Sequence, residues 1–163
     1  MDAEDPTRHL GTVDVMVAIS NEQRRRRLGQ RHYLASPASS IDDVARTLNG
    51  LHSSDPVTVY LSGWARVIGF TRDDLDNSLY EKRTLLRMHG MRRTMFVVPP
   101  DLAGVMTAAC TDTYVATERK RLVGFLEDAG VAEDAAAWLE RVEAATVAAL
   151  DELGQATANE LRD

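Results

Sequence analysis

The apolar pattern of this chain changes its period once, close to residue 84. Before that point apolar residues recur at spacings of three and four, which is typical of helices that bury one face. After it come two short runs, residues 85–88 and 94–98, whose composition predicts strands. The segment between them turns near Arg92 and Arg93, and Pro99-Pro100 stops the second strand. The sequence therefore predicts several helices followed by one β-hairpin.

Capping residues mark where the helices before residue 84 begin. Ser and Thr hydroxyls and the Asp carboxylate accept hydrogen bonds from the free amides of a first helical turn. Four such starts are present, at Ser20, Ser40, Asp55 and Thr71. Gln23 and Asp74, three residues after Ser20 and Thr71, complete capping-box patterns. The predicted helices span roughly 21–34, 41–48, 56–68 and 72–83.

The third of these helices carries an apolar stripe. Val57, Tyr60, Leu61, Trp64 and Ile68 recur at helical spacing, and we expect this face to pack into the core. The alternative is a strand over residues 57–61, but the stripe continues through Ile68 and favours a helix.

Helices followed by a hairpin with arginines at its tip form the element order of a winged helix. In that fold one helix enters the major groove of DNA and the hairpin, or wing, contacts the backbone or the minor groove. We therefore predict a mainly α fold with a β-hairpin wing. We expect a flexible arm at 1–19, a winged-helix domain at 20–100, connecting helices at 101–153, and the start of a second, truncated winged helix at 154–163. The chain is then expected to be the N-terminal part of a longer protein.

The charge of the chain is unevenly distributed. The formal net charge of −6 argues against a nucleic-acid partner. However, residues 20–40 hold five arginines against one glutamate, and residues 81–100 hold five basic residues against one glutamate. Clustered positive charge attracts a phosphate backbone, so we predict double-stranded DNA as the partner. The candidate DNA-binding residues in these two segments are Arg24, Arg25, Arg27, Arg87, Arg92 and Arg93. Arg66, which is polar on an otherwise apolar helix, is a further candidate and is expected to enter the groove. The alternatives are solvated arginine faces and arginines paired with the chain's own acidic residues.

Other composition features restrict the setting. No segment approaches the roughly 20 apolar residues of a membrane span, and the acidic N-terminus lacks the basic start of a secretory signal. The single Cys110 cannot form an internal disulfide, and the four histidines are scattered. We therefore expect a cytoplasmic protein with no membrane contact, no metal and no cofactor.

A longer stretch resembles a known family, and it reads LNGLHSSDPVTVYLSGWARVIGFTRDDLDNSLYEKRTLLRMHGMRRTMFVVPPDL. The shared features are an Arg- and Leu-rich first helix, an Asp-Pro helix start with Trp-Ala-Arg, then Gly-Phe and Asp-Asp-Leu, and a Met-Arg-x-Thr hairpin. In these features residues 20–105 resemble the winged-helix family that includes the AlkZ-like and YcaQ-like DNA glycosylases. The likeness continues more loosely through residues 154–161. It implies tandem winged helices on duplex DNA and cleavage of the N-glycosidic bond of alkylated purines.

The resemblance also indicates where an active site would lie. Catalytic members carry Gln-x-Gln or Gln-x-Asp in the turn before the Asp-Pro helix, and the two catalytic positions match His52 and Ser54 here. A neutral imidazole can accept a proton from a water molecule, and a serine hydroxyl can position that water. We therefore predict His52 as general base and Ser54 as the water-positioning group, with Asp55 as a cap that could also orient His52. The alternative is that residues 53–55 only form a turn and His52 packs at an interface.

Three functions are compatible with these residues. The first is a DNA-binding protein with glycosylase activity on alkylated bases. The second is a non-catalytic DNA-binding regulator or lesion sensor. The third is a winged-helix module for protein–protein contact, which the acidic net charge favours.

Overall fold

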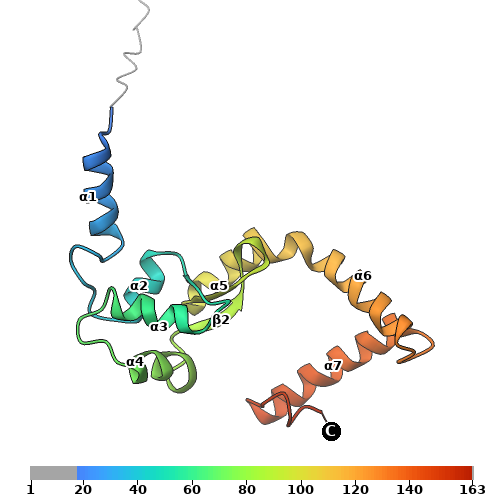
Figure 1. Ribbon diagram of the computed structural model, residues 1–163. Helices are drawn as coiled ribbons and strands as arrows, with labels where there is room; N and C mark the ends of the chain where they lie inside the picture. Colours follow the sequence, from blue (N-terminus) through green and yellow to red (C-terminus); the bar gives the residue numbers. More distant parts are fainter. Residues whose placement is uncertain (1–17, 163) are drawn as a thin grey trace, which may run out of the picture.

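The computed structural model describes residues 18–162, so the predicted arm at 1–19 lies almost entirely outside the described residues. The described chain is mainly helical with one small sheet (Figure 1). The helices are α1 (Asn21–Arg31), α2 (Ile41–Thr47), α3 (Val57–Trp64), α4 (Arg72–Asp76), α5 (Pro100–Met106), α6 (Asp112–Asp128) and α7 (Ala135–Leu153). Three short turns complete them: the π-helical η1 (Asn77–Glu81) and η3 (Thr107–Thr111), and the 3₁₀ turn η2 (Met91–Arg93).

The predicted helix starts at Ser20, Ser40 and Thr71 are confirmed, and α3 begins at Val57, one residue later than predicted. Ser20 and Gln23 form the reciprocal capping box of α1, and Thr71 and Asp74 form that of α4. The hydroxyl of Ser40 accepts a hydrogen bond from the amide of Asp43 at the start of α2. These bonds join residues only three apart, so the local sequence is sufficient to predict them.

The strands form one antiparallel sheet, and one of them was not predicted. β2 (Leu86–His89) and β3 (Met95–Val98) make the expected hairpin, while β1 (Leu51–His52) adds a third strand on the other side of β3. The sheet order is therefore β1–β3–β2. His52 pairs with Phe96, and Phe96 pairs with Met88 on β2. The segment expected to be only a turn between two helices thus begins as the edge of the sheet.

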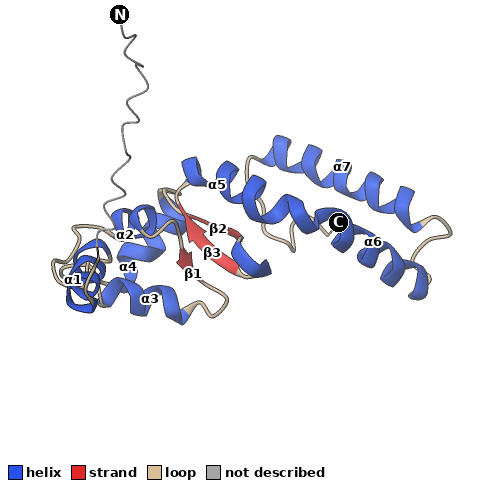
Figure 2. Ribbon diagram, turned by 90° about the horizontal axis from the view of Figure 1, so that it is seen from above, coloured by secondary structure: helices blue, strands red, loops and turns tan. Residues whose placement is uncertain are grey.

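The sheet separates two groups of helices (Figure 2). Leu51 and Val97 pack with α2, α3 and α4 in the larger core, where Val44 and Leu85 are fully buried. Successive residues of a strand point to opposite faces. Phe96 and Val98 therefore pack on the other side, against Met106 of α5. His52 shares the face of its pairing partner Phe96, which is the side of α5.

Of the apolar stripe predicted for α3, only Tyr60 packs partly buried against the larger core among the five residues named for it. Val57, Leu61, Trp64 and Ile68 are all more than half exposed, and Ile68 is 74% exposed. The helix instead buries Val59 and Gly63. A Cβ on Gly63 would lie 2.4 Å from the ring of Phe70, so the glycine lets this ring pack directly against the helix backbone. The helix was predicted correctly, but its buried face was not.

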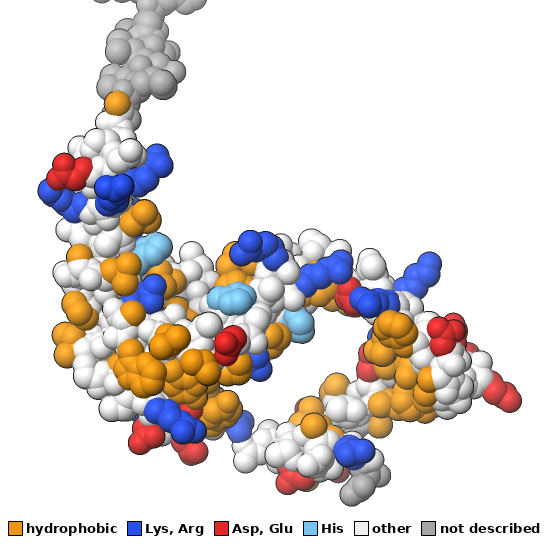
Figure 3. All heavy atoms as spheres, viewed as in Figure 1, with side chains coloured by type: hydrophobic (Ala, Val, Ile, Leu, Met, Phe, Trp, Pro, Cys, Tyr) orange, Lys and Arg blue, Asp and Glu red, His pale blue; other side chains and the backbone are white. Residues whose placement is uncertain are grey.

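Helices α6 and α7 form an arm beyond the sheet. No residue of α6 is buried, and in α7 only Ala135 and Leu139 are. Figure 3 shows an opening between this arm and the rest of the molecule. The arm returns to the first group of helices where Arg83 donates a hydrogen bond to Gln155. Within residues 18–162 no helix is both long enough and apolar enough to cross a membrane.

Candidate functional site

The predicted catalytic turn lies at the edge of the sheet, and its first residue is accessible. The His52 side chain is exposed, and its ring meets that of Phe96 edge-on at 5.4 Å between centroids. Within the described chain the imidazole makes no hydrogen bond, whereas the His52 carbonyl accepts one from the Thr58 hydroxyl at 2.9 Å. Backbone contacts therefore fix the position of His52 and leave its ring nitrogens available.

The two serines that follow have different surroundings. Ser53 is 1% exposed, its amide donates to the Met95 carbonyl at 2.8 Å, and its hydroxyl has no partner in the described structure. Ser54 is exposed, and its hydroxyl oxygen accepts a hydrogen bond from the Met95 amide at 3.2 Å. Because that oxygen acts as the acceptor, the Ser54 hydroxyl proton remains available to another group. The predicted water-positioning residue is thus also a link between the turn and β3.

Asp55 caps α3, as the sequence indicated. Its carboxylate accepts a hydrogen bond from the Val57 amide at 3.0 Å, and its carbonyl, 2.7 Å from the Thr58 hydroxyl, shares the one proton of that hydroxyl with the His52 carbonyl. No hydrogen bond joins Asp55 to His52 in the described part of the chain. The structure therefore gives Asp55 the capping role and does not give it the role of orienting the imidazole.

Arg87 connects the hairpin to this turn. It is exposed on β2, and its guanidinium Nη2 donates to the Ser53 carbonyl at 2.9 Å. It lines a small pocket of about 60 Å³ that also involves Ser53, Tyr60 and Tyr80. The Tyr60 hydroxyl itself donates to Asp76, which lies outside this pocket, at 2.6 Å, and this bond raises the pKa of Tyr60. Arg87 is therefore both a surface arginine and a support for the turn.

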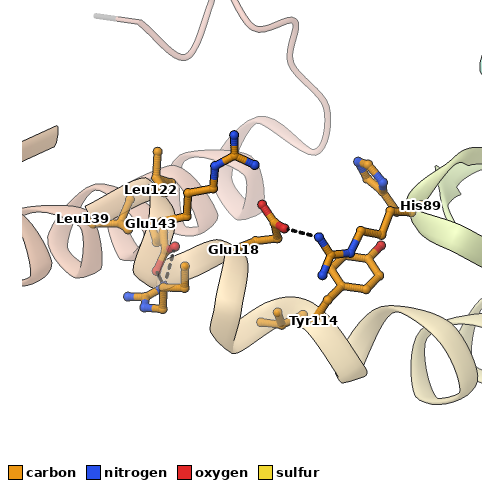
Figure 4. A pocket seen from close by; sticks show the side chains of 10 residues that line it. His89, Tyr114, Glu118, Leu122, Leu139 and Glu143 are labelled. Carbon is orange, nitrogen blue, oxygen red and sulfur yellow. Dashed lines mark hydrogen bonds and ion pairs between the residues drawn. The ribbon is translucent and has the colours of Figure 1, made fainter. Parts of the chain in front are cut away.

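The hairpin tip is held against α6. Arg92 and Arg93 both have positive φ angles, 55° and 59°. Arg93 forms an ion pair with Glu118 at 2.8 Å, and its guanidinium carbon lies 5.1 Å above the ring of Tyr114 (Figure 4). These residues belong to an open pocket of about 620 Å³ between the hairpin, α6 and α7. Arg92 is exposed and has no side-chain partner among residues 18–162.

The arginines of α1 are all exposed, but they differ in their contacts. Arg26 forms an ion pair with Glu22 at 3.2 Å, one turn earlier. Arg24, Arg25 and Arg27 make no ion pair in the described residues. Figure 3 shows lysine and arginine side chains over α1 and, on the same face, over the hairpin and α6. The two basic segments of the sequence therefore contribute to one face of the molecule.

Arg66 has a different position from the one expected. It lies beyond the end of α3 and is partly buried, and its Nη1 donates to the Ser62 carbonyl at 3.3 Å. Its Nε is buried without a partner in the described structure. Arg66 therefore lies back against its own helix.

Two residues of this region were missed by the sequence analysis, Tyr114 and Glu118. They lie 21 and 25 positions after Arg93, on a helix with no local motif that links them to the hairpin. Only the packing of α6 against the hairpin brings them together, so no signal in the sequence identified them.

These features define a class of protein: a mainly helical chain with a three-stranded sheet, in which exposed arginines flank a polar turn at the sheet edge. A family model for AlkZ-like DNA glycosylases matches residues 45–163. The chain therefore belongs to the AlkZ-like DNA glycosylase family, as its resemblance indicated. The search of curated proteins gave no match, and neither did the search of solved structures.

Proposed function

We propose that this chain is a DNA-binding winged-helix protein that hydrolyses the N-glycosidic bond of alkylated bases in duplex DNA. The element order β1–α3–α4–β2–β3 supports a winged helix within residues 20–100, with β2 and β3 as the wing. Residues 101–153 are then connecting helices. A second unit begins near Thr157, whose amide donates to Glu160 at 2.7 Å, as at the start of a capped helix.

The observation that carries DNA binding is the shared basic face of α1 and the hairpin. Arg24, Arg25, Arg27 and Arg92 make no ion pair in the described residues, so their charges remain available to phosphates. Helix α4, by contrast, carries Asp73, Asp74 and Asp76 in its short length. Carboxylates repel a phosphate backbone. The duplex is therefore bound through α1 and the wing, with α4 turned away from it.

A salt titration tests this surface. Each arginine that neutralises a phosphate contributes about one to the slope of log K against log salt. Arg24 and Arg27 are three residues apart and share one side of α1. The double variant Arg24→Ala/Arg27→Ala is expected to weaken duplex binding and to lower the slope by about two. Arg26→Ala, which removes an arginine already paired with Glu22, is the matched control and is expected to change it less. Absence of duplex binding by the wild type at low salt contradicts the proposal.

The polar turn is suited to hydrolysis of a bond whose leaving group is already activated. An N7-alkylated purine carries positive charge, so it leaves as a neutral base without needing a general acid. A water molecule between the two side chains would donate a hydrogen bond to the His52 imidazole and accept one from the Ser54 hydroxyl. As the C1′–N bond breaks, the water oxygen bonds to C1′ and its proton passes to His52.

Release of 7-methylguanine from alkylated duplex tests this role. His52→Ala is expected to lower the excision rate by about 10²-fold or more, the usual contribution of a general base. His52→Gln introduces the glutamine that the catalytic members of the family carry at this position, and this variant is expected to keep part of the activity. His89→Ala, at another exposed histidine, is the control. Unchanged excision by His52→Ala removes His52 from the mechanism. Binding without excision by the wild type indicates a non-catalytic sensor instead.

A further inference from the structure

The tip of the hairpin has an unusual sequence for its conformation. The Thr94 amide donates to the Met91 carbonyl at 3.2 Å, and the Gly90 amide donates to the Thr94 carbonyl at 2.9 Å. These bonds close a turn with two central residues of positive φ, Arg92 and Arg93. Such turns usually take Asn-Gly because side chains disfavour this backbone region. Two successive arginines in it require stabilising contacts from elsewhere.

Helix α6 provides those contacts through Arg93. The Arg93–Glu118 pair and the Tyr114 ring hold the guanidinium on two sides (Figure 4). Nearby, the Thr111 hydroxyl donates to the His89 carbonyl at 3.3 Å, which ties the same end of β2 to η3, just before α6. The side chain of Arg93 is therefore occupied inside the molecule, although it lies next to Arg92 in the sequence.

We propose that Glu118 and Tyr114 are positioning residues of the wing. They hold Arg93, and Arg93 fixes the left-handed turn in which Arg92 projects as the arginine that contacts the DNA backbone. The inference rests on the proposed function for its DNA contact, but the anchoring contact itself does not. The proposal gives Arg92 and Arg93 different roles, although the sequence predicted the same role for both.

The alternative to positioning is that Glu118 only competes with DNA for Arg93. Replacing Glu118 distinguishes the two, because they predict opposite changes in duplex affinity. If Glu118 merely competes with DNA for Arg93, then Glu118→Gln frees a positive charge and strengthens binding. If Glu118 positions the wing, the same variant weakens duplex binding several-fold. Glu143→Gln is the matched control, because Glu143 pairs with Arg119 at 2.7 Å in the same pocket and has the same charge. Affinities of the Glu118 variant are compared with those of this control.

A double-mutant cycle adds a second criterion. Arg93→Ala and Glu118→Gln are expected to weaken binding by similar factors, and the double variant is expected to be no weaker than either. Arg92→Ala is expected to lower the salt slope by about one. Independent, additive losses from Arg93→Ala and Glu118→Gln overturn the proposal, and so does tighter binding by Glu118→Gln than by Glu143→Gln.

The anchor can be tested without DNA. The backbone coupling constants and amide exchange of Arg92, Arg93 and Thr94 by NMR report the turn. We expect the positive φ angles in the wild type and in Glu143→Gln, and a loss of them in Glu118→Gln and Tyr114→Leu. An unchanged turn in both variants overturns the anchor. If the wild type fails to bind duplex, the proposed function fails, and the NMR comparison still decides the anchor.

Discussion

Two neighbouring serines, Ser53 and Ser54, show that the surroundings of a hydroxyl determine its contribution to the free energy of unfolding. The Ser53 hydroxyl is buried without a partner in the described structure, and the Ser54 hydroxyl accepts from the Met95 amide. A buried polar group without a hydrogen bond opposes folding. We therefore expect Ser53→Ala to be neutral or stabilising. Ser54→Ala should lower the free energy of unfolding by about 0.5–1.5 kcal/mol, the net worth of one hydrogen bond.

Urea denaturation of the two variants and the wild type measures these effects. A loss above about 1 kcal/mol for Ser53→Ala would show that its hydroxyl is satisfied by a buried water molecule. Because Ser54 is also the predicted water-positioning residue, its stability effect must be known before any loss of excision is assigned to catalysis.

Two glycines allow a second comparison at the residue scale. A Cβ at Gly63 would meet the buried Phe70 ring at 2.4 Å, while a Cβ at Gly104 of α5 has nothing within 4 Å. Overpacking a core costs about 1–3 kcal/mol, so Gly63→Ala is expected to destabilise by that amount. Gly104→Ala is expected to stabilise by about 0.5–1 kcal/mol, because alanine favours a helix interior over glycine. Thermal melts of both variants check this, and a neutral Gly63→Ala would show that Phe70 can move aside.

At the scale of elements, the helices and strands that could be predicted are those whose start or pairing depends on residues close together in the chain. Capping residues act within three positions, and the strands of the hairpin lie close together in the chain, so α1, α2, α4 and the hairpin were all predictable. Strand β1 was not, because two residues carry no periodicity and their partner Val97 lies 46 positions later. The buried face of α3 was also missed, since the choice of Val59 and Gly63 over Trp64 depends on where Phe70 packs.

The capping box of α4 predicts a pH dependence of stability. The backbone amide and the hydroxyl of Thr71 donate to Asp74 at 2.8 Å each, and these bonds lower the pKa of Asp74 below its ordinary value of 3.8. A lowered folded-state pKa means that the contribution is complete above the ordinary value and is lost as the pH falls through the folded one. Asp74→Asn is therefore expected to lower the free energy of unfolding at neutral pH. The variant should also lose less of that free energy than the wild type as the pH falls into the acid range.

Urea midpoints of this variant between pH 7 and pH 2 provide the measurement. Asp73→Asn removes the same charge from the same helical turn, but Asp73 has no bond to Thr71. It is the control for charge alone. If the urea midpoint falls equally steeply with acid in Asp74→Asn and in the wild type, the role given to Asp74 is wrong.

At the scale of the whole molecule, the candidate site depends on contacts that the sequence does not encode locally. Six of the seven arginines were chosen by clustering and Arg66 because it is polar on an otherwise apolar helix, and the structure gives them different surroundings. Arg93 is paired with Glu118, Arg87 donates to the Ser53 carbonyl, and Arg66 lies back on α3. No ion pair is made in the described chain by the other four, which are Arg24, Arg25, Arg27 and Arg92. That these arginines form a DNA-binding face stays a prediction. The division of tasks arises from the packing of α6 and β1, which lie far from these arginines in sequence.

The helical arm should open more easily than the rest of the molecule. Helix α7 buries only Ala135 and Leu139, and α6 buries no residue, whereas β3 buries Phe96, Val97 and Val98. Local opening needs less free energy where less apolar surface is buried. We therefore expect amide hydrogens of α6 and α7 to exchange faster than those of β3 in a mass-spectrometric exchange experiment. Equal protection of α7 and β3 would contradict this expectation.

The same experiment shows whether the arm takes part in binding. If the wing is anchored through Glu118, then duplex DNA should slow exchange in the hairpin and also in the first turns of α6, where Tyr114 and Glu118 lie. No hydrogen bond or ion pair joins α7 to Arg92 or Arg93 in the described chain, so its exchange should change little. In Glu118→Gln the effect on α6 should disappear while any effect on α1 remains, because the arginines of α1 reach the same face without the wing.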